Sequence, residues 1–332
     1  MEMSHPLKRR TFTPPEVEEP EMEELGFSEQ FLLPKGVEDI DAGDNNVFLA
    51  TDYVNDIYRY LRSLERKQTV GQDFMASQTV MTPKMRSVLV DWLVNIHHQF
   101  KLLPETLFMG ISILDRFIEK NNASKDKIQL IGVTAFFIAS KFEEIYPPDL
   151  ADFVVVCDSL YSKKDILKME TMMLASLKFE IGRPLPLHFL RRNSKAAHAD
   201  PTIHTMAKYL MELTLIDHLC SPWLPSALAA ASLYVTLKVL STPCSMEDED
   251  SRDPVDGAWT DTLAFYSGFS ELEVQPFAAR LCKVVKDTAK NIEKGRFKNV
   301  YRKFSSSKNL CISKSPLLDC PFIHDMAAKV PN

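Results

Sequence analysis

Hydrophobic residues recur at intervals of three and four along most of this chain, which is the spacing of a helix with one buried face. Helices are therefore predicted over residues 52–65, 83–102, 104–118, 125–143 and 163–178. No segment shows the sustained alternation of apolar and polar residues that is typical of a strand. The pattern predicts an all-α protein.

Residues that favour helix starts stand at the beginnings of these segments. Pro83 follows Thr82, and Pro104 opens the next segment, since a proline is well tolerated in the first helical turn. Ser124 and Ser162 precede two further segments as expected N-caps. The predicted boundaries thus have local chemical support.

Two blocks of sequence repeat after about 100 residues. The block at 111–115 (ISILD) is echoed at 213–217 (LTLID), and the block at 134–141 (TAFFIASK) is echoed at 231–238 (ASLYVTLK). This period is too long for one unit of a solenoid. The repeat predicts a duplicated helical domain whose linker is the segment 182–186 (GRPLP).

The duplication divides the chain into regions of different composition. Residues 49–180 are expected to form an N-terminal helix with the first domain, and residues 181–303 the second domain. Residues 1–48 are rich in Pro and Glu and are predicted to be a disordered regulatory tail. Residues 243–257 are expected to be an exposed acidic insert, and residues 304–332 a loosely ordered tail.

Composition narrows the possible functions. The 332 residues carry a formal net charge of −6, which argues against a large basic face for nucleic acid. The six cysteines form no CxxC pair and are expected to be reduced thiols of a cytosolic or nuclear protein. Charged residues interrupt every apolar run well before the ~18 residues of a membrane span.

Motifs of catalysis and cofactor binding are missing from the sequence. There is no Walker loop, no GxGxxG after a strand, no HExxH and no GxSxG. His97 and His98 have no acidic or Cys partner at ligand spacing, so no metal site or cofactor is expected. Nothing in the pattern indicates an enzyme.

Residues 141–148 (KFEEIYPP) end the apolar segment 128–140 with three charges and a proline pair. The prolines prevent the helix from continuing. Charges at the end of a buried helix need partners, and no cofactor motif lies nearby. This stretch therefore predicts contact with another protein.

The segment 83–102 is apolar on most of its circumference, as expected for a helix at the centre of a bundle. Arg86 falls within an apolar sector, where an unpaired guanidinium would be costly, and Asp115 is its predicted partner. Met85, Val88, Leu89 and Trp92 form a stripe with two interpretations. It is either core packing or a surface for a short apolar peptide.

Several of these motifs resemble those of the cyclin family. The segment 85–93 (MRSVLVDWL) is similar to the opening of the cyclin box, and 139–148 (ASKFEEIYPP) is similar to its third-helix signature. Residues 52–65 (DYVNDIYRYLRSLE), 183–192 (RPLPLHFLRR) and 207–214 (AKYLMELT) resemble the mitotic B-type group. The resemblance implies two tandem five-helix cyclin boxes and covers about residues 38–300.

The resemblance implies a regulatory subunit of a mitotic cyclin-dependent kinase, active at the G2/M transition and located in cytoplasm and nucleus. Lys141 and Glu170 would hydrogen-bond the backbone of the kinase's mobile αC helix, although a surface ion pair is the simpler alternative. The implied kinase-binding set is Lys141, Glu170, Phe142, Ile145, Ile138, Leu174 and Phe179.

Two further sites follow from the resemblance. The stripe on segment 83–102 becomes a docking patch for substrates or inhibitors with a basic-x-Leu motif. Its implied members are Met85, Val88, Leu89, Trp92, Ile128 and Gln129. Asn95 stands where cyclin A-like sequences have an acid that pairs with the basic residue of the motif.

The second implied site is a basic pocket for phosphorylated partners. Arg191, His204 and Lys208 match its positions in B-type cyclins, and His204 and Lys208 share one helical face. A solvated basic face is the alternative for these three residues.

Two other functions compete with the kinase regulator. An adaptor of the transcription-factor or pocket-protein type shares the duplicated fold, but it predicts a basic surface that the net charge does not favour. A helical-bundle enzyme would need an inward cluster of polar residues or metal ligands, and none is visible in the sequence.

Overall fold

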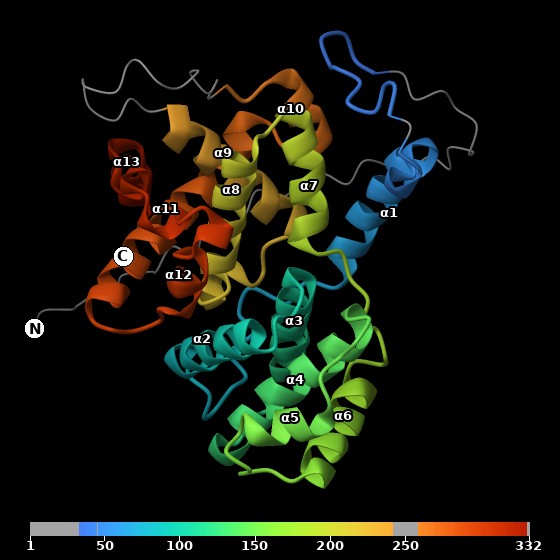
Figure 1. Ribbon diagram of the computed structural model, residues 1–332, viewed down its shortest axis with the longest axis vertical. Coiled ribbons are helices and arrows are strands. Elements are labelled where there is room, and N and C mark those ends of the chain that lie inside the picture. Colours follow the sequence, from blue (N-terminus) through green and yellow to red (C-terminus); the bar gives the residue numbers. More distant parts are fainter. Residues whose placement is uncertain (1–32, 45, 242–257, 331–332) are drawn as a thin grey trace, which may run out of the picture. The chain divides into compact units, whose positions relative to one another are not determined.

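The computed structural model describes residues 33–44, 46–241 and 258–330 and is helical with no strand in these ranges (Figure 1). The predicted all-α fold class is confirmed. The acidic insert predicted at 243–257 lies outside the described residues.

The first five-helix bundle follows the N-terminal helix α1 (Val54–Lys67). It comprises α2 (Pro83–Gln99), α3 (Pro104–Lys120), α4 (Ile128–Glu143), α5 (Leu150–Val155) and α6 (Lys163–Ser176). Helix α4 is central and contacts the other four. Its sequence is apolar around the whole circumference, and residues 130–140 are all buried.

Two glycines let the helices of this bundle approach closely. A Cβ atom on Gly110 of α3 would lie 2.6 Å from the ring of Phe136 on α4, and one on Gly132 of α4 would lie 2.8 Å from Leu89 on α2. Any larger residue at either position would force the helices apart, because such distances are below van der Waals contact.

The second bundle repeats this arrangement. It comprises α7 (Pro186–Ala196), α8 (Pro201–Thr214), α9 (Pro225–Ser241), α10 (Asp261–Ser267) and α11 (Glu271–Glu293). Helix α9 is central, contacts the other four, and buries every residue from 225 to 237. The two tandem five-helix domains implied by the sequence are confirmed.

The repeated sequence blocks occupy equivalent places in the two bundles. The first pair of blocks lies in α3 and at the end of α8, and the second pair lies in the central helices α4 and α9. The short helix α5 was not predicted. Its six residues are too few to establish a helical period, although Asp149 and Asp152 form a capping box at its start.

The prediction of a loosely ordered tail after residue 303 is wrong for the described residues. Helix α12 (Asn299–Phe304) packs against α2, and α13 (Pro321–Ala328) packs against α11 and α9. Ile323 of α13 has no exposed surface. The segment is Ser- and Lys-rich overall, but a few apolar residues of α13 are sufficient to pack this short helix against the second bundle.

The predicted tail 1–48 also ends too late. Residues 1–32 lie outside the described residues, but Asp41 forms a bidentate ion pair with Arg192 of α7, at 2.6 and 2.5 Å. Burial raises the pKa of Asp41, but hydrogen bonds from Arg192 and Lys195 outweigh it and hold this pKa below its usual value. The composition of residues 1–48 could not reveal this anchoring, because Arg192 lies 151 residues further along the sequence.

Helix α1 is joined to the second bundle by polar contacts. The buried carboxylate of Glu65 accepts hydrogen bonds from the backbone N–H and the hydroxyl of Ser226, at 2.9 and 2.6 Å, and so caps the N-terminus of α9. Tyr58 donates to the carbonyl of His188 at 2.8 Å. These bonds fix α1 although much of its outer face is exposed.

Arg86 and Asp115 form a buried ion pair next to the junction of the two bundles. The guanidinium Nε and Nη2 atoms donate to the two carboxylate oxygens at 2.7 and 2.6 Å. Arg86 also donates to the carbonyl of Leu215 and the hydroxyl of Ser221 in the second bundle, both at 3.0 Å. One fully buried side chain thus links α2, α3 and the end of α8.

We expect Asp115→Asn to lower the free energy of unfolding by about 3 kcal/mol, because it leaves a buried guanidinium without its counter-ion. The double variant Arg86→Met/Asp115→Asn should lose less free energy of unfolding than the single variants Arg86→Met and Asp115→Asn lose when their losses are added. Urea denaturation of all four proteins measures this coupling. A loss below about 1 kcal/mol in Asp115→Asn would contradict the assigned role.

A second prediction concerns His97, which is buried in α2. Its Nε2 atom lies 3.1 Å from the carbonyl of Leu103, and its Nδ1 atom has no hydrogen-bond partner. Burial, assisted by the positive charge of Lys303, lowers the pKa of His97 to about 3. The folded protein therefore keeps this imidazole neutral, whereas the unfolded chain protonates it below about pH 6.5.

Because the unfolded state binds the extra proton, the stability contributed by neutral His97 is lost as the pH falls from 6.5 towards 3. When the pH falls from 7 to 5, the free energy of unfolding of the natural protein should decrease by about 2 kcal/mol more than that of a His97→Gln variant. Denaturation curves of both proteins at the two pH values measure this difference. Equal losses would show that His97 titrates normally in the folded state.

Candidate functional site

The C-terminus of α4 and the middle of α6 bring Lys141 and Glu170 together. The Lys141 ammonium forms an ion pair with Oε1 of Glu170 and lies 4.2 Å from the centre of the Phe137 ring. The Lys141 side chain is 43% exposed, whereas the Glu170 side chain is 11% exposed. The pair thus lies at the surface, with the lysine on the outside and able to donate further hydrogen bonds.

Large apolar side chains are exposed near the C-terminal ends of α4 and α6. Phe142, Ile145 and Phe179 are 56, 87 and 72% exposed, which is unusual for residues of their size. Leu174 is half-buried between them and the core, and Ile138 lies beneath the surface in α4. We call the exposed members of this group, with Lys141 and Glu170, the α4/α6 face.

A strained turn after α6 presents Phe179 to solvent. Lys178 and Phe179 both adopt left-handed backbone conformations, with φ of 53° and 59°. Such values are uncommon outside glycine and cost free energy in a bulky residue. The backbone N–H of Phe179 donates to the carbonyl of Leu174 at 2.9 Å, which closes the turn.

The three charges that end α4 have different roles. Glu144 accepts hydrogen bonds from the backbone of Leu103 at 2.7 Å and the hydroxyl of Thr106 at 2.5 Å, so it caps the start of α3. The prediction that these charges need a partner outside the chain is therefore wrong for Glu144. Burial raises the pKa of Glu143, and the carboxylates of Glu105 and Glu144 raise it further.

The second bundle contains an equivalent of the lysine–glutamate pair. Lys238 of α9 lies 3.1 Å from Glu271 of α11 and 5.3 Å from the centre of the Tyr234 ring. The next residue in this copy, Val239, is fully buried, where the first copy has the exposed Phe142. Both bundles thus have the ion pair, but the residue after the lysine is exposed in the first bundle and buried in the second.

Sequence reasoning missed two residues of the α4/α6 face. Leu167 is 45% exposed on α6, and Tyr146 is 91% exposed after α4. Leu167, Glu170 and Leu174 are spaced three and four residues apart, so helical periodicity alone places them on one side of α6. That spacing was a usable signal for Leu167.

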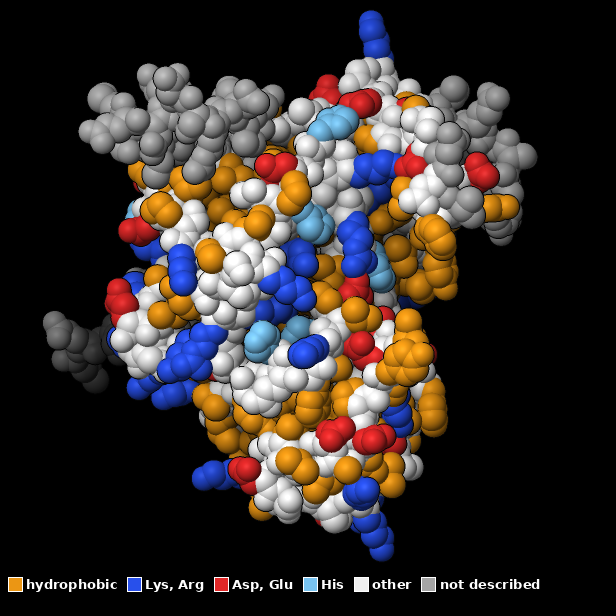
Figure 2. All heavy atoms as spheres, in the orientation of Figure 1, with side chains coloured by type: hydrophobic (Ala, Val, Ile, Leu, Met, Phe, Trp, Pro, Cys, Tyr) orange, Lys and Arg blue, Asp and Glu red, His pale blue; other side chains and the backbone are white. Residues whose placement is uncertain are grey.

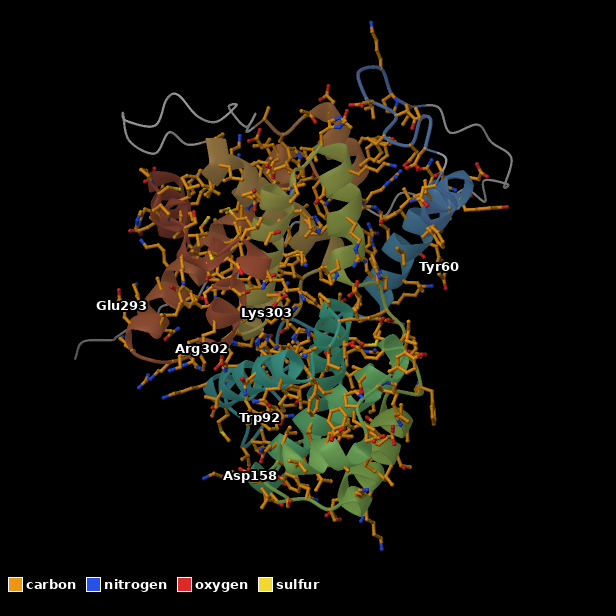
Figure 3. All side chains as sticks on the ribbon, viewed as in Figure 1. Tyr60, Trp92, Asp158, Glu293, Arg302 and Lys303 are labelled. Atoms are coloured by element: carbon orange, nitrogen blue, oxygen red, sulfur yellow. The ribbon has the colours of Figure 1, made fainter. Side chains whose placement is uncertain are left out.

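The proposed docking patch comes from α2 and α4. Val88 is exposed, Met85, Trp92 and Gln129 are half-buried, and Leu89 and Ile128 are mostly buried. The inner members of the stripe pack in the core, and its outer members reach solvent, so the peptide-binding interpretation stays a prediction for the outer members. Figure 3 labels Trp92 on the side of α2 away from α12.

The three candidate phosphate-binding residues lie on α7 and α8, and two of them already have partners within the chain. Arg191 forms an ion pair with Glu105 of α3, and Nδ1 of His204 lies 2.9 Å from the hydroxyl of Ser194. Burial lowers the pKa of His204, and the charges of Lys208 and Arg191 lower it further. Burial likewise lowers the pKa of Lys208.

Comparison with known proteins identifies the family. Residues 56–182 match the family model of the cyclin N-terminal domain, and residues 184–318 match that of the cyclin C-terminal domain. The chain belongs to the cyclin family. The match boundary falls at the linker between the two bundles, where the sequence repeat had placed it.

Curated relatives of this cyclin are G2/mitotic-specific B-type cyclins. The chain is 46% identical to cyclin-B of Patella vulgata over 87% of its own length and 67% of the relative's. It is 44% identical to cyclin-B of Marthasterias glacialis, over 91% and 73% of the two chains. It is 42% identical to cyclin-B2 of Homo sapiens, over 95% and 75%.

A solved structure supports the fold. The viral cyclin from herpesvirus saimiri superposes with a TM-score of 0.57 at 21% identity, covering 70% of this chain and 95% of the viral one. Within the described parts of this cyclin, no helix is long and apolar enough to cross a membrane, and no group of three His, Cys, Asp or Glu side chains is placed to hold a metal ion.

Proposed function

We propose that this cyclin is the non-catalytic regulatory subunit of a mitotic cyclin-dependent Ser/Thr kinase, which it binds and activates to control the G2/M transition. The α4/α6 face carries this proposal. It combines a half-exposed ammonium with three exposed apolar side chains, Phe142, Ile145 and Phe179, on one surface of a folded domain. Exposed apolar clusters of this kind mark protein-binding sites.

The chemistry of the α4/α6 face suits a helix as its ligand. The apolar side chains would receive the nonpolar side of the kinase's αC helix, while Lys141 donates to free backbone carbonyls at a helix end. Glu170 keeps the ammonium oriented and accepts a hydrogen bond from backbone N–H. Burial of Phe142, Ile145 and Phe179 would supply most of the affinity.

Binding of this kind would activate the kinase by selecting one conformation. A kinase is active when its αC helix is turned inward, because an αC glutamate then pairs with the lysine that positions ATP. A cyclin that contacts αC only in this position binds the active state more tightly and shifts the equilibrium towards it. No catalytic group of the cyclin is required.

The two other candidate surfaces would bring in substrates or phosphorylated partners. The docking patch, which is formed by α2 and α4, would receive the apolar residues of a basic-x-Leu segment of the partner. Arg191, His204 and Lys208 would bind a phosphate group that competes with Glu105 for Arg191. We propose cytoplasm and nucleus as the locations, in keeping with a kinase regulator that acts at mitosis.

The kinase-binding proposal predicts the effect of removing the ion pair. A double variant Lys141→Ala/Glu170→Ala should weaken binding to a mitotic cyclin-dependent kinase at least tenfold, since both polar anchors of the face are lost. Co-purification and a histone phosphorylation assay measure binding and activation. The matched control is Lys238→Ala/Glu271→Ala, which removes the equivalent pair of the second bundle. Full activation of the kinase by the Lys141→Ala/Glu170→Ala variant would contradict the proposed interface.

The phosphate-binding proposal predicts a separate effect. Lys208→Glu should weaken binding of a phosphoserine peptide about tenfold or more and leave kinase affinity unchanged, because it reverses one charge of the pocket far from the α4/α6 face. Fluorescence anisotropy with the phosphorylated peptide and its serine counterpart measures the change. Equal loss of peptide and kinase binding would instead indicate a general folding defect.

A further inference from the structure

Helix α12 forms one border of the docking patch. Asn299, the first residue of α12, donates from its backbone N–H to the Asp91 carboxylate at 3.0 Å. Its side-chain amide donates to the carbonyl and carboxylate of the same residue, at 3.0 and 2.8 Å. Asp91 lies three residues after the exposed Val88 and so on nearly the same face of α2, which means that these three bonds fix α12 beside the outer edge of the patch.

This border carries positive charge. Arg302 is exposed and Lys298 is half-buried. Burial raises the pKa of Asp91, and the positive charges of Arg302 and Lys298 offset part of this rise, so both cations lie near the same carboxylate. Arg302 forms no ion pair with any described residue, whereas Lys303 is neutralised by Glu212 at 2.7 and 2.8 Å. Arg302 and Lys298 are thus the cations available to a ligand.

The carboxylate of Asp91 offsets part of this positive charge, but it is a single anion beside two cations, and Asn95, one helical turn further along α2, is neutral. In Figure 3 Arg302 is labelled on the side of α12 that faces α2, with Trp92 on the far side of α2. Figure 2 shows Lys and Arg side chains gathered beside a region of hydrophobic side chains below α2.

We propose that the docking patch selects segments that carry acidic or phosphorylated residues on the flank lying over α12. This rests on the proposed docking role of the patch and specifies the class of its ligand. Arg302 and Lys298 attract the acidic flank and repel a basic one, while Met85, Val88 and Trp92 receive the apolar residues. Arg302 is the residue that determines this preference.

The test uses the full chain and fluorescein-labelled 15-residue peptides with one shared basic-x-Leu core. The peptides carry three Asp, three phosphoserine, three Ser or three Lys residues, either before or after the core. We expect one acidic flank to tighten binding about five- to tenfold over the Ser flank at 50 mM salt, and the Lys flank in the same position to weaken it. The difference should shrink at 500 mM salt.

Charge reversal at Arg302 provides the decisive comparison. Arg302→Glu should invert the order of the acidic and basic flanks, whereas Arg66→Glu, at another exposed arginine on α1, should leave it unchanged. Trp92→Ala, and the milder Val88→Ser at an exposed position, should weaken all peptides alike. Thermal melts check that each variant is folded.

The outcomes separate the two proposals. Suppose that Trp92→Ala and Val88→Ser abolish binding. If flanking charge then has no effect, or if Arg302→Glu behaves like Arg66→Glu, the charge preference is contradicted but the docking role is supported. If no peptide binds, or neither patch variant matters, the docking role itself fails and the preference with it. Inversion by Arg302→Glu alone supports the preference.

Discussion

The buried guanidinium of Arg86 constrains the arrangement of both bundles. A charge in this position needs a carboxylate and further acceptors at fixed distances, and Asp115, Leu215 and Ser221 supply them from three elements. Apolar packing tolerates small sliding between helices, but hydrogen bonds with these directions do not. Since α2 also carries the proposed docking patch and packs against α4, this ion pair helps to fix the positions of both proposed binding surfaces of the first bundle.

The duplication shows which features of the first bundle are shared with the second and which are not. Both bundles keep a lysine on the central helix, an aromatic ring one turn earlier, and a glutamate on the fifth helix. The pair by itself is therefore a structural feature of the bundle. What differs is the chain after the lysine, which is solvent-exposed at Phe142 and Ile145 but returns to the core at Val239.

The core of the fold was predictable because it depends on periodic patterns. Helices such as 83–102 and 163–178 were found within a few residues of their observed ends, and the repeat located both central helices. The ion pair of Arg86 followed from one charge in an apolar sector. Contacts between distant residues were not predictable, since nothing near Asp41 signals Arg192 and nothing near Asp91 signals Asn299. The same limitation hid the cap that Glu144 forms on α3.

These unpredicted contacts involve segments whose composition is polar. Helix α12 belongs to a Lys- and Arg-rich stretch that would be solvated in isolation, and it is held by the amide of Asn299 and by the packing of Val300 and Phe304. Because α12 packs against α2, its cations are held at the edge of an apolar surface. Less free energy is then needed to order them when a ligand binds, so they attract the ligand more effectively. In the proposed docking role, the apolar stripe of α2 would provide affinity, and the polar segment packed beside it would provide selectivity.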